Sequence, residues 1–327
     1  MNIIKDSKVL IILGNGHNLA LGLRTSYADF GKLYIKQMIK FSESKLCNDL
    51  VKSYYSAPQS WNNLEQKIKE FALSFDPIND NVQIEYIFFD WLRKNLGWYM
   101  DGEAKYWFLI NPTYDNKTYH DKLTNSLPYF IFQTILNNDY RYDILSFNYT
   151  WLEVLLNRIT CDIYNLPPSS TQYNYSAENI YESRFNINYV HLSGNNCILG
   201  IDDDKRVSDS ISFLKKAHQF NSSNNYPLNL HKYKSILIYG HSLGESDTDF
   251  MKLLFADMMD KDINNNPKLY FVTYDSASKH TILNNLTKHL RSDLSEIQRH
   301  IEYDFIITNE IHLDDAKTKL SQTLFEY

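Results

Sequence analysis

The short apolar run Val9–Leu13 ends at Gly14-Asn15-Gly16, and no other stretch constrains the fold as strongly. An apolar run of this length that stops at glycines is typical of a strand buried inside a parallel sheet. Glycine allows a sharp turn here, and a helix is expected to begin directly after it. The first N–H groups of a helix have no partners within it, so the turn can hold a phosphate group. An ordinary tight strand–helix turn accounts for the same residues.

Further apolar runs alternate with helical patterns after residue 140. Strands are expected at 143–147, 186–192, 197–199, 235–239, 268–274 and 305–308. Helices are expected at 151–162, 209–220 and 278–300, from Ser246 or Asp247 onward, and again from Leu313. This alternation predicts an α/β fold with a doubly wound, mostly parallel, Rossmann-like sheet.

Residues 27–140 show helical spacing and contain no convincing strand. The region is too long for an ordinary crossover between two strands. We therefore predict a helical insertion or subdomain over residues 31–140. Residues 1–30 and 141–327 then form the nucleotide-binding α/β domain.

Polar clusters follow three of the expected strands, at Gly14–Gly16, Ser146–Asn148 and Gly240–Ser242. Ligands of open α/β sheets bind outside the carboxyl ends of the strands, so the three clusters predict one shared cleft. A third glycine, Gly22, gives the spacing G-x-G-x5-G. The usual dinucleotide fingerprint has its third glycine earlier, where this chain has Leu19.

Composition excludes several classes of protein. The net charge of −6 argues against a general nucleic-acid binder. Three scattered cysteines without a C-x-x-C pair argue against a zinc site, and no other metal-ligand spacing stands out. No signal peptide is recognisable and no apolar stretch reaches the roughly 18 residues of a membrane span, so a cytoplasmic protein is expected.

Taken together, the motifs resemble those of AbiH-type phage abortive-infection proteins. The resemblance lies in residues 14–30, Ser146–Thr150, His191–Gly194 with Ile198–Gly200, and Gly240–Asp249, with a smaller feature at Trp61–Glu65. The AbiH family is in turn distantly similar to the sirtuin-like NAD-binding fold, which has the same G-x-G-x5-G spacing.

The resemblance implies roles for individual residues. Asn148 takes the position of the asparagine that approaches the nicotinamide ribose, and His191 is the candidate general base. In the sirtuin-like pattern the base directly precedes a glycine, a place that Ser193 holds here. Residues i and i+2 of a strand share a face, so His191 can still reach the cleft. The cofactor-binding residues implied are Gly14, Asn15, Gly16, Asn18, Gly22, Gly194, Gly240, Ser242 and Asp249.

The function implied is a cytosolic antiphage effector that binds NAD or a related nucleotide and cleaves its nicotinamide–ribose bond. Loss of NAD would stop phage growth at the cell's expense. An alternative keeps the nucleotide site without catalysis, as a sensor or interaction module of antiphage defence. The phage trigger and the formation of a homo-oligomer are left open.

A third hypothesis is an α/β serine hydrolase. Gly240–Gly244 matches G-x-S-x-G between a strand and a helix, the pattern of a nucleophile elbow. Ser242 would be the nucleophile, with Asp275 as the acid and His280 or His289 as the base. The glycines at 14–16 have no role in such an enzyme.

Structural roles explain the same candidate residues. Asn148 can cap a turn with its side chain, and His191 can be a hydrogen-bonded core histidine. Asp247 and Asp249 stand at an expected helix start, where carboxylates act as caps.

Overall fold

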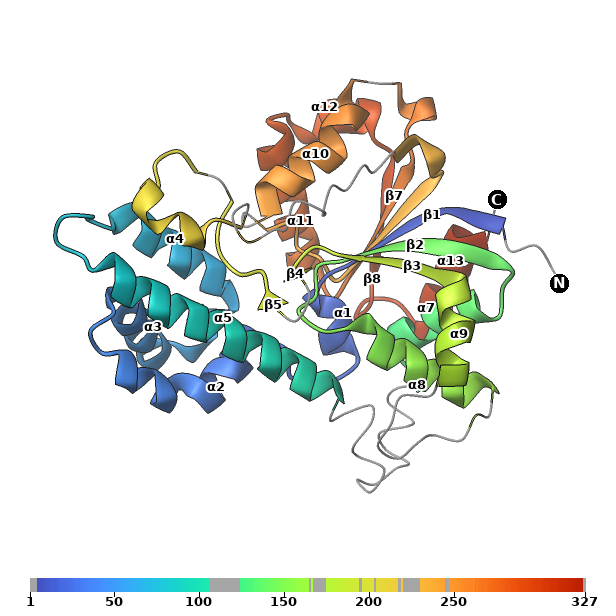
Figure 1. Ribbon diagram of the computed structural model, residues 1–327. Helices are drawn as coiled ribbons and strands as arrows, with labels where there is room; N and C mark the ends of the chain where they lie inside the picture. Colours follow the sequence, from blue (N-terminus) through green and yellow to red (C-terminus); the bar gives the residue numbers. More distant parts are fainter. Residues whose placement is uncertain are drawn as a thin grey trace.

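The computed structural model describes residues 5–105, 124–164, 166, 175–193, 196–202, 204–216, 219, 230–244, 247–260 and 262–325. Its centre is a six-stranded, all-parallel sheet with the order β3-β2-β1-β6-β7-β8 (Figure 1). The strands are β1 (Lys5–Leu13), β2 (Tyr140–Ser146), β3 (Phe185–Tyr189), β6 (Ser235–Tyr239), β7 (Lys268–Thr273) and β8 (Tyr303–Ile307). A parallel α/β sheet is therefore confirmed.

Both faces of the sheet are buried. Val9, Ile11 and Leu13 of β1 belong to one apolar core, and Leu10 and Ile12 belong to another. The first core includes side chains of α7 (Leu127–Leu136), α8 (Leu152–Tyr164), α9 (Tyr175–Arg184) and α13 (Leu313–Phe325). The second includes side chains of α10 (Thr248–Met259), α11 (Ser276–Leu290) and α12 (Leu294–His300). Helices on both faces explain why β1 is apolar without alternation.

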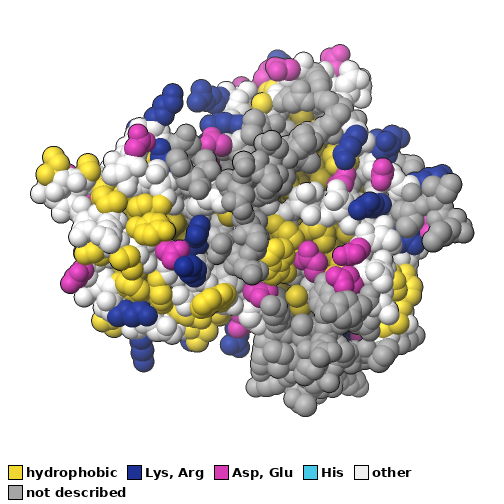
Figure 2. All heavy atoms as spheres, viewed as in Figure 1, with side chains coloured by type: hydrophobic (Ala, Val, Ile, Leu, Met, Phe, Trp, Pro, Cys, Tyr) yellow, Lys and Arg dark blue, Asp and Glu magenta, His cyan; other side chains and the backbone are white. Residues whose placement is uncertain are grey.

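A helical block lies beyond the carboxyl edge of the sheet (Figure 1). It consists of α2 (Tyr27–Met38), η1 (Ile39–Phe41), α3 (Lys45–Ser56), η2 (Pro58–Asn63), α4 (Leu64–Ser74) and α5 (Val82–Lys105). Its core also takes in Cys197, Leu199, Ile201 and Leu214 from a later part of the chain. Hydrophobic side chains also gather on its surface in the view of Figure 2.

The boundaries of the predicted domains stay a prediction. Within 31–140, helix α7 packs under the sheet with the α/β core, whereas α2 to α5 share a core of their own. A buried glutamate, Glu85 of α5, connects α5 to α3 within the core of the helical block. Its carboxylate accepts hydrogen bonds from the Ser44 hydroxyl at 2.7 Å and from the Lys45 and Leu46 N–H groups at the start of α3.

Three expected elements differ in the structure. Strand β3 ends at Tyr189, and residues 192–193 and 196–197 form the short antiparallel pair β4 (Leu192–Ser193) and β5 (Asn196–Cys197). Helix 278–300 is divided into α11 and α12, because Arg291 has a left-handed φ of 54°. The continuous helix expected at 209–220 is wrong, because the 3-10 helix η4 (Asp209–Leu214) ends at Leu214 and Lys215 is extended.

The chain leaves the helical path after η4 because its backbone groups pair with Ile201 instead. The Ile201 N–H donates to Leu214, and the Lys216 N–H donates to Ile201 at 2.7 Å. This short parallel pairing with residue 201 holds Lys215 in an extended conformation, and the side chain of the next residue, Lys216, enters the site described below.

Close packing of two glycine turns sets the carboxyl edge of the sheet. Leu13 is level with Ser146 of β2 and with Tyr239 of β6. The Gly16 N–H, in α1 (Asn15–Ala20), donates to the Gly240 carbonyl at 2.9 Å. A Cβ on Gly16 would lie 2.7 Å from the Gly240 Cα, so no side chain fits between the turns. β1 and β6 are also where the strand order reverses, the usual crevice of open α/β sheets.

We predict that Gly240→Ala lowers the free energy of unfolding by about 1–3 kcal/mol. Gly240 has a φ of 63°, and its added Cβ would lie 2.4 Å from the His17 nitrogen. Gly102→Ala is the matched control, because Gly102 lies in helix α5 with no atom within 4 Å of the added Cβ. It is expected to stabilise by up to about 1 kcal/mol through helix propensity. Urea denaturation measures both changes, and a Gly240→Ala protein as stable as the parent would contradict the packing.

Candidate functional site

A cavity of about 1310 Å³ opens between the helical block and the carboxyl edge of the sheet. Its lining includes Gly16 and Gly240 at the paired turns, His191 after β3, and Asp247 before α10. Helix α4 of the block contributes Glu65 to the same lining. The three predicted clusters lie at one edge because the strands end in register, and Gly14–Gly16 and Gly240–Ser242 both contribute to the cavity lining. Of Ser146–Asn148 only Phe147 lines the cavity.

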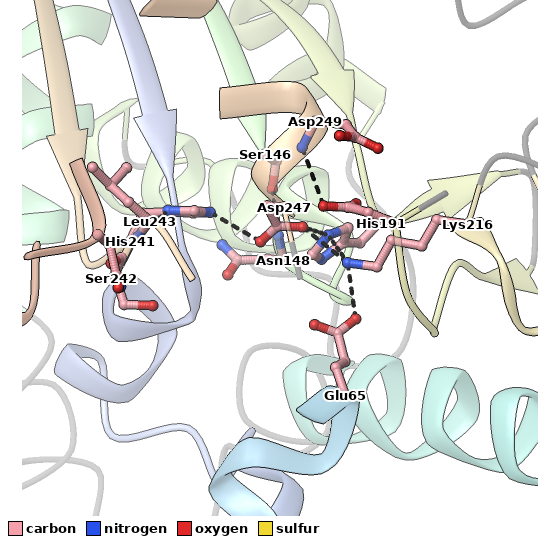
Figure 3. A network of polar contacts seen from close by, with 12 residues as sticks. Glu65, Ser146, Asn148, His191, Lys216, His241, Ser242, Leu243, Asp247 and Asp249 are labelled. Carbon is pink, nitrogen blue, oxygen red and sulfur yellow. Dashed lines mark hydrogen bonds and ion pairs between the residues drawn. The ribbon is translucent and has the colours of Figure 1, made fainter. Parts of the chain in front are cut away.

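A buried ion cluster lies at this cavity (Figure 3). The Lys216 ammonium is 2.9 Å from Asp247 Oδ1 and 2.9 Å from Glu65 Oε1. Burial opposes the charged form of Lys216, but the carboxylates of Asp247 and Glu65 outweigh it and raise the lysine pKa above its usual range. Buried charges persist only when paired in this way.

Asp247 is ionised in this environment. Burial alone would raise its pKa, but the Lys216 charge and hydrogen bonds from His191 and His241 hold the pKa well below its usual range. Asp247 lies between His241 and Lys216 in Figure 3. Although it stands at the N-terminus of α10, its carboxylate makes no capping hydrogen bond there. The structural alternative of a helix cap is therefore wrong for Asp247.

His191 is paired with Asp247. Its Nε2 is 2.8 Å from Asp247 Oδ1, and an ionised carboxylate only accepts hydrogen bonds, so Nε2 carries the proton. The lone pair is then on Nδ1, which is buried and makes no hydrogen bond within the described part of the chain. The Tyr149 ring stacks on the imidazole with centroids 5.0 Å apart, and only 4% of His191 is exposed.

Asn148 is also buried at this edge, with 2% exposure. Its side-chain oxygen Oδ1 has no hydrogen-bond partner among the residues that the structure describes. The capping of a turn by this oxygen is therefore not observed. Buried amide oxygens in folded proteins almost always accept a hydrogen bond, so this one is suited to a ligand hydroxyl or a bound water.

His241 is a second histidine beside Asp247. Its Nδ1 accepts a hydrogen bond from the Leu243 N–H at 2.9 Å, which places its proton on Nε2. That nitrogen is 3.6 Å from Asp247 Oδ2. Sequence reasoning missed the roles of Glu65, Lys216 and His241. Two of them lie inside the motifs Trp61–Glu65 and Gly240–Asp249, whereas Lys216 carries no local signal at all.

Three N–H groups of the glycine loop donate to backbone carbonyls. The N–H groups of Gly14, Gly16 and His17 donate to the carbonyls of Tyr239, Gly240 and Gly14. These donors therefore have partners outside α1, and a phosphate at this turn would have to be held by other groups.

The other predicted loop residues have structural contacts. Asn15 exchanges side-chain hydrogen bonds with Thr25, and the Asn18 amide donates to the Thr150 hydroxyl at 2.8 Å. Gly22 has a φ of 82° just after α1. Only Asn15 and Gly16 of the predicted loop residues are part of the cavity lining. Cofactor binding by the loop stays a prediction.

The later candidates lie at the mouth of the cavity. Ser242 is exposed, and Asp249 donates its backbone N–H to Asp202 Oδ2 at 3.1 Å. Both line the cavity. Gly194 lies outside the described residues.

The serine-hydrolase triad is not assembled from Ser242, Asp275 and His289. The Asp275 carboxylate accepts from the Ser278 N–H and caps α11. The His289 Nε2 donates to the Leu243 carbonyl at 2.7 Å, which fixes the turn where Leu243 has a φ of 53°. These two residues support the turn and the helix instead of activating the hydroxyl.

Within the described residues, no group of three or more His, Cys, Asp or Glu side chains could hold a metal ion. No helix among them is long and apolar enough to cross a membrane. The three cysteines, Cys47, Cys161 and Cys197, are buried and form no disulfide.

A family model described as bacteriophage abortive infection AbiH matches residues 10–265. The matched stretch contains the glycine loop, Asn148, His191, Lys216 and Asp247. No match was found among curated proteins or solved structures.

We predict that the free energy of unfolding falls less steeply with rising pH in Asp202→Asn than in the parent protein. Burial and the neighbouring carboxylates of Asp249 and Asp247 raise the pKa of Asp202 to about 7. Between its unfolded value near 4 and this value, the native carboxyl keeps a proton that the unfolded chain releases, so stability falls as pH rises. The slope from this group is at most about 1.4 kcal/mol per pH unit, and the variant lacks it.

Urea denaturation at pH 5 and pH 7 measures the effect. Asp204→Asn is the matched control, because hydrogen bonds and the charge of Arg206 lower the pKa of Asp204. Asp204 is ionised at both pH values, so that variant should differ from the parent equally at each. Equal pH dependence of Asp202→Asn and the parent would show that Asp202 is ionised throughout.

Proposed function

Because the chain belongs to the bacteriophage abortive infection AbiH family, we propose that it defends its host cell against phage by hydrolysing NAD or a related nucleotide. The bond cleaved is the one between nicotinamide and ribose. The nucleotide occupies the cavity between the helical block and the sheet edge. The proposal includes a distant relationship between this domain and the sirtuin-like NAD-binding fold.

The observation that carries this proposal is the carboxylate–histidine pair at the cavity. Asp247 accepts a hydrogen bond from His191 Nε2 at 2.8 Å, and the Nδ1 lone pair has no partner among the described residues. An imidazole with one bare nitrogen is an efficient proton acceptor near neutral pH. A second carboxylate–histidine contact, through His241, supports the orientation of Asp247.

The charges around the cavity suit NAD. Two carboxylates and one ammonium, those of Glu65, Asp247 and Lys216, leave one net negative charge at the ion cluster when the imidazoles are neutral. The nicotinamide ring of NAD is cationic and is favoured there. Lysine and arginine side chains also line the cavity and can contact the pyrophosphate: Lys69, Lys205, Arg206, Lys252 and Arg291. The strand order reverses at β1 and β6, the usual place for a dinucleotide.

In the proposed reaction a water attacks the ribose carbon that bears nicotinamide. The C–N bond breaks with its electron pair, and nicotinamide leaves as a neutral molecule. His191 Nδ1 takes the proton from the water, and Asp247 stabilises the imidazolium that forms. Asn148 Oδ1 accepts a hydrogen bond from a ribose hydroxyl and orients the sugar. The products are ADP-ribose, nicotinamide and a proton.

A second candidate function is a nucleotide sensor without catalysis. The near-complete burial of His191 and Asn148 favours it, because a water must reach the base for hydrolysis. A sensor would bind NAD and change its contacts with another defence protein without consuming the ligand.

We predict that His191→Ala and Asn148→Ala each lose most NAD hydrolysis while still binding NAD. Loss of a general base costs about 10²–10⁴-fold in rate. Nicotinamide release by the pure protein, with and without an extract of infected cells, measures the rate. Both variants should also lose protection against phage.

His312→Ala and Asn284→Ala are matched controls, because both residues are exposed and neither lines the cavity. Their rates should equal that of the parent. Loss of turnover in Asn148→Ala alone would assign the base to another group. Full protection by both site variants, with cellular NAD unchanged in every strain, would contradict hydrolysis and favour the sensor.

A further inference from the structure

The helical block reaches the carboxylate–histidine pair through Glu65 of α4. Its Oε1 is 2.9 Å from the Lys216 ammonium and accepts the Tyr149 hydroxyl at 3.1 Å. The Tyr149 hydroxyl in turn accepts from the Tyr27 hydroxyl of α2 at 2.9 Å. Lys216 and Tyr149 both contact His191, one at its edge and one at its ring face. Two helices of the block therefore act on one imidazole.

The Lys216 ammonium and the Asp247 carboxylate make opposite demands on His191. The ammonium is 3.3 Å from Nε2, and a hydrogen bond from it would need the Nε2 lone pair. The proton would then be on Nδ1, and the imidazole would have no bare nitrogen at the site of the proposed base. The carboxylate at 2.8 Å requires the proton on Nε2. Which ring nitrogen of His191 carries the proton therefore depends on whether the Lys216 ammonium donates to His191 or to the carboxylates.

We propose that Glu65 is a positioning residue, which draws the Lys216 ammonium away from His191 and so keeps the imidazole proton on Nε2. The site is then complete only when the helical block contributes this carboxylate. The catalytic meaning of the inference rests on the proposed function, whereas the position of the proton is a property of the protein without substrate.

The other groups around His191 do not make this distinction. Phe147 contacts the imidazole edge-on and Tyr149 contacts its face, and neither ring contact is a hydrogen bond to a ring nitrogen of His191. His241 faces Asp247 Oδ2, on the carboxylate oxygen that His191 does not use. Among the described residues that contact His191, only Asp247 and Lys216 act on Nε2.

The test is the tautomer of His191 in Glu65→Gln, measured by NMR of protein with ¹⁵N-labelled imidazoles. The glutamine keeps an oxygen for Lys216 and Tyr149, but an amide accepts more weakly than a carboxylate. We expect the proton on Nε2 in the parent and a shift toward Nδ1 in the variant. If Glu65→Gln does not fold, Glu65→Asp withdraws the carboxylate by one methylene, and the same shift is expected.

Glu85→Gln is the matched control. Glu85 is also a buried glutamate of the helical block, but its hydrogen bonds go to Ser44, Lys45 and Leu46. The control variant should keep the parental tautomer, which separates the loss of the Glu65 charge from a general loosening of the block.

Kinetics separate the positioning role from the proposed function. In Glu65→Gln we expect kcat for NAD hydrolysis to fall by up to about 100-fold with KM unchanged, as for a misplaced catalytic group. An unchanged tautomer in Glu65→Gln overturns the positioning role, whether or not the parent hydrolyses NAD. If the tautomer shifts in Glu65→Gln but the parent protein releases no nicotinamide from NAD, the positioning role is supported and NAD hydrolysis is contradicted.

Discussion

The arrangement of the site depends on the two buried ion pairs of the Lys216 ammonium. The ammonium joins Glu65 of the helical block to Asp247 at the sheet edge, and both carboxylates are nearly excluded from water. Removing the Lys216 ammonium would leave two buried carboxylates without compensation, and a loss of this kind typically costs about 3–5 kcal/mol. The cluster therefore connects the docking of the helical block to the electrostatics around His191.

Backbone packing supplies the second constraint. Gly16 and Gly240 allow two turns to approach within a distance that no side chain could occupy. This contact fixes the ends of β1 and β6 beside each other, and Asp247 follows the second turn by only a few residues. The glycines of the loop are thus required for packing between turns, although their sequence pattern first indicates contact with a phosphate.

The sequence was informative wherever the signal was local. The apolar runs predicted the central strands because each strand is buried on both faces, and the polar residues after them predicted a shared edge. Lys216 could not be found this way, because its place depends on pairing between Ile201 and residues 214–216. The same pairing ended the predicted helix at Leu214. Asp247 resembled a helix cap because a carboxylate at a helix start usually is one, and only the fold brings Lys216 and His191 to it.

The most direct test of the central claim is a crystal structure of the protein with ADP-ribose bound. The claim is that the cavity between the helical block and the sheet edge holds a nucleotide with its ribose at His191 and Asn148. The account predicts the terminal ribose within hydrogen-bond distance of His191 Nδ1 and Asn148 Oδ1, with the pyrophosphate in the same cavity. ADP-ribose bound elsewhere, or no bound ligand at millimolar concentration, would contradict the account.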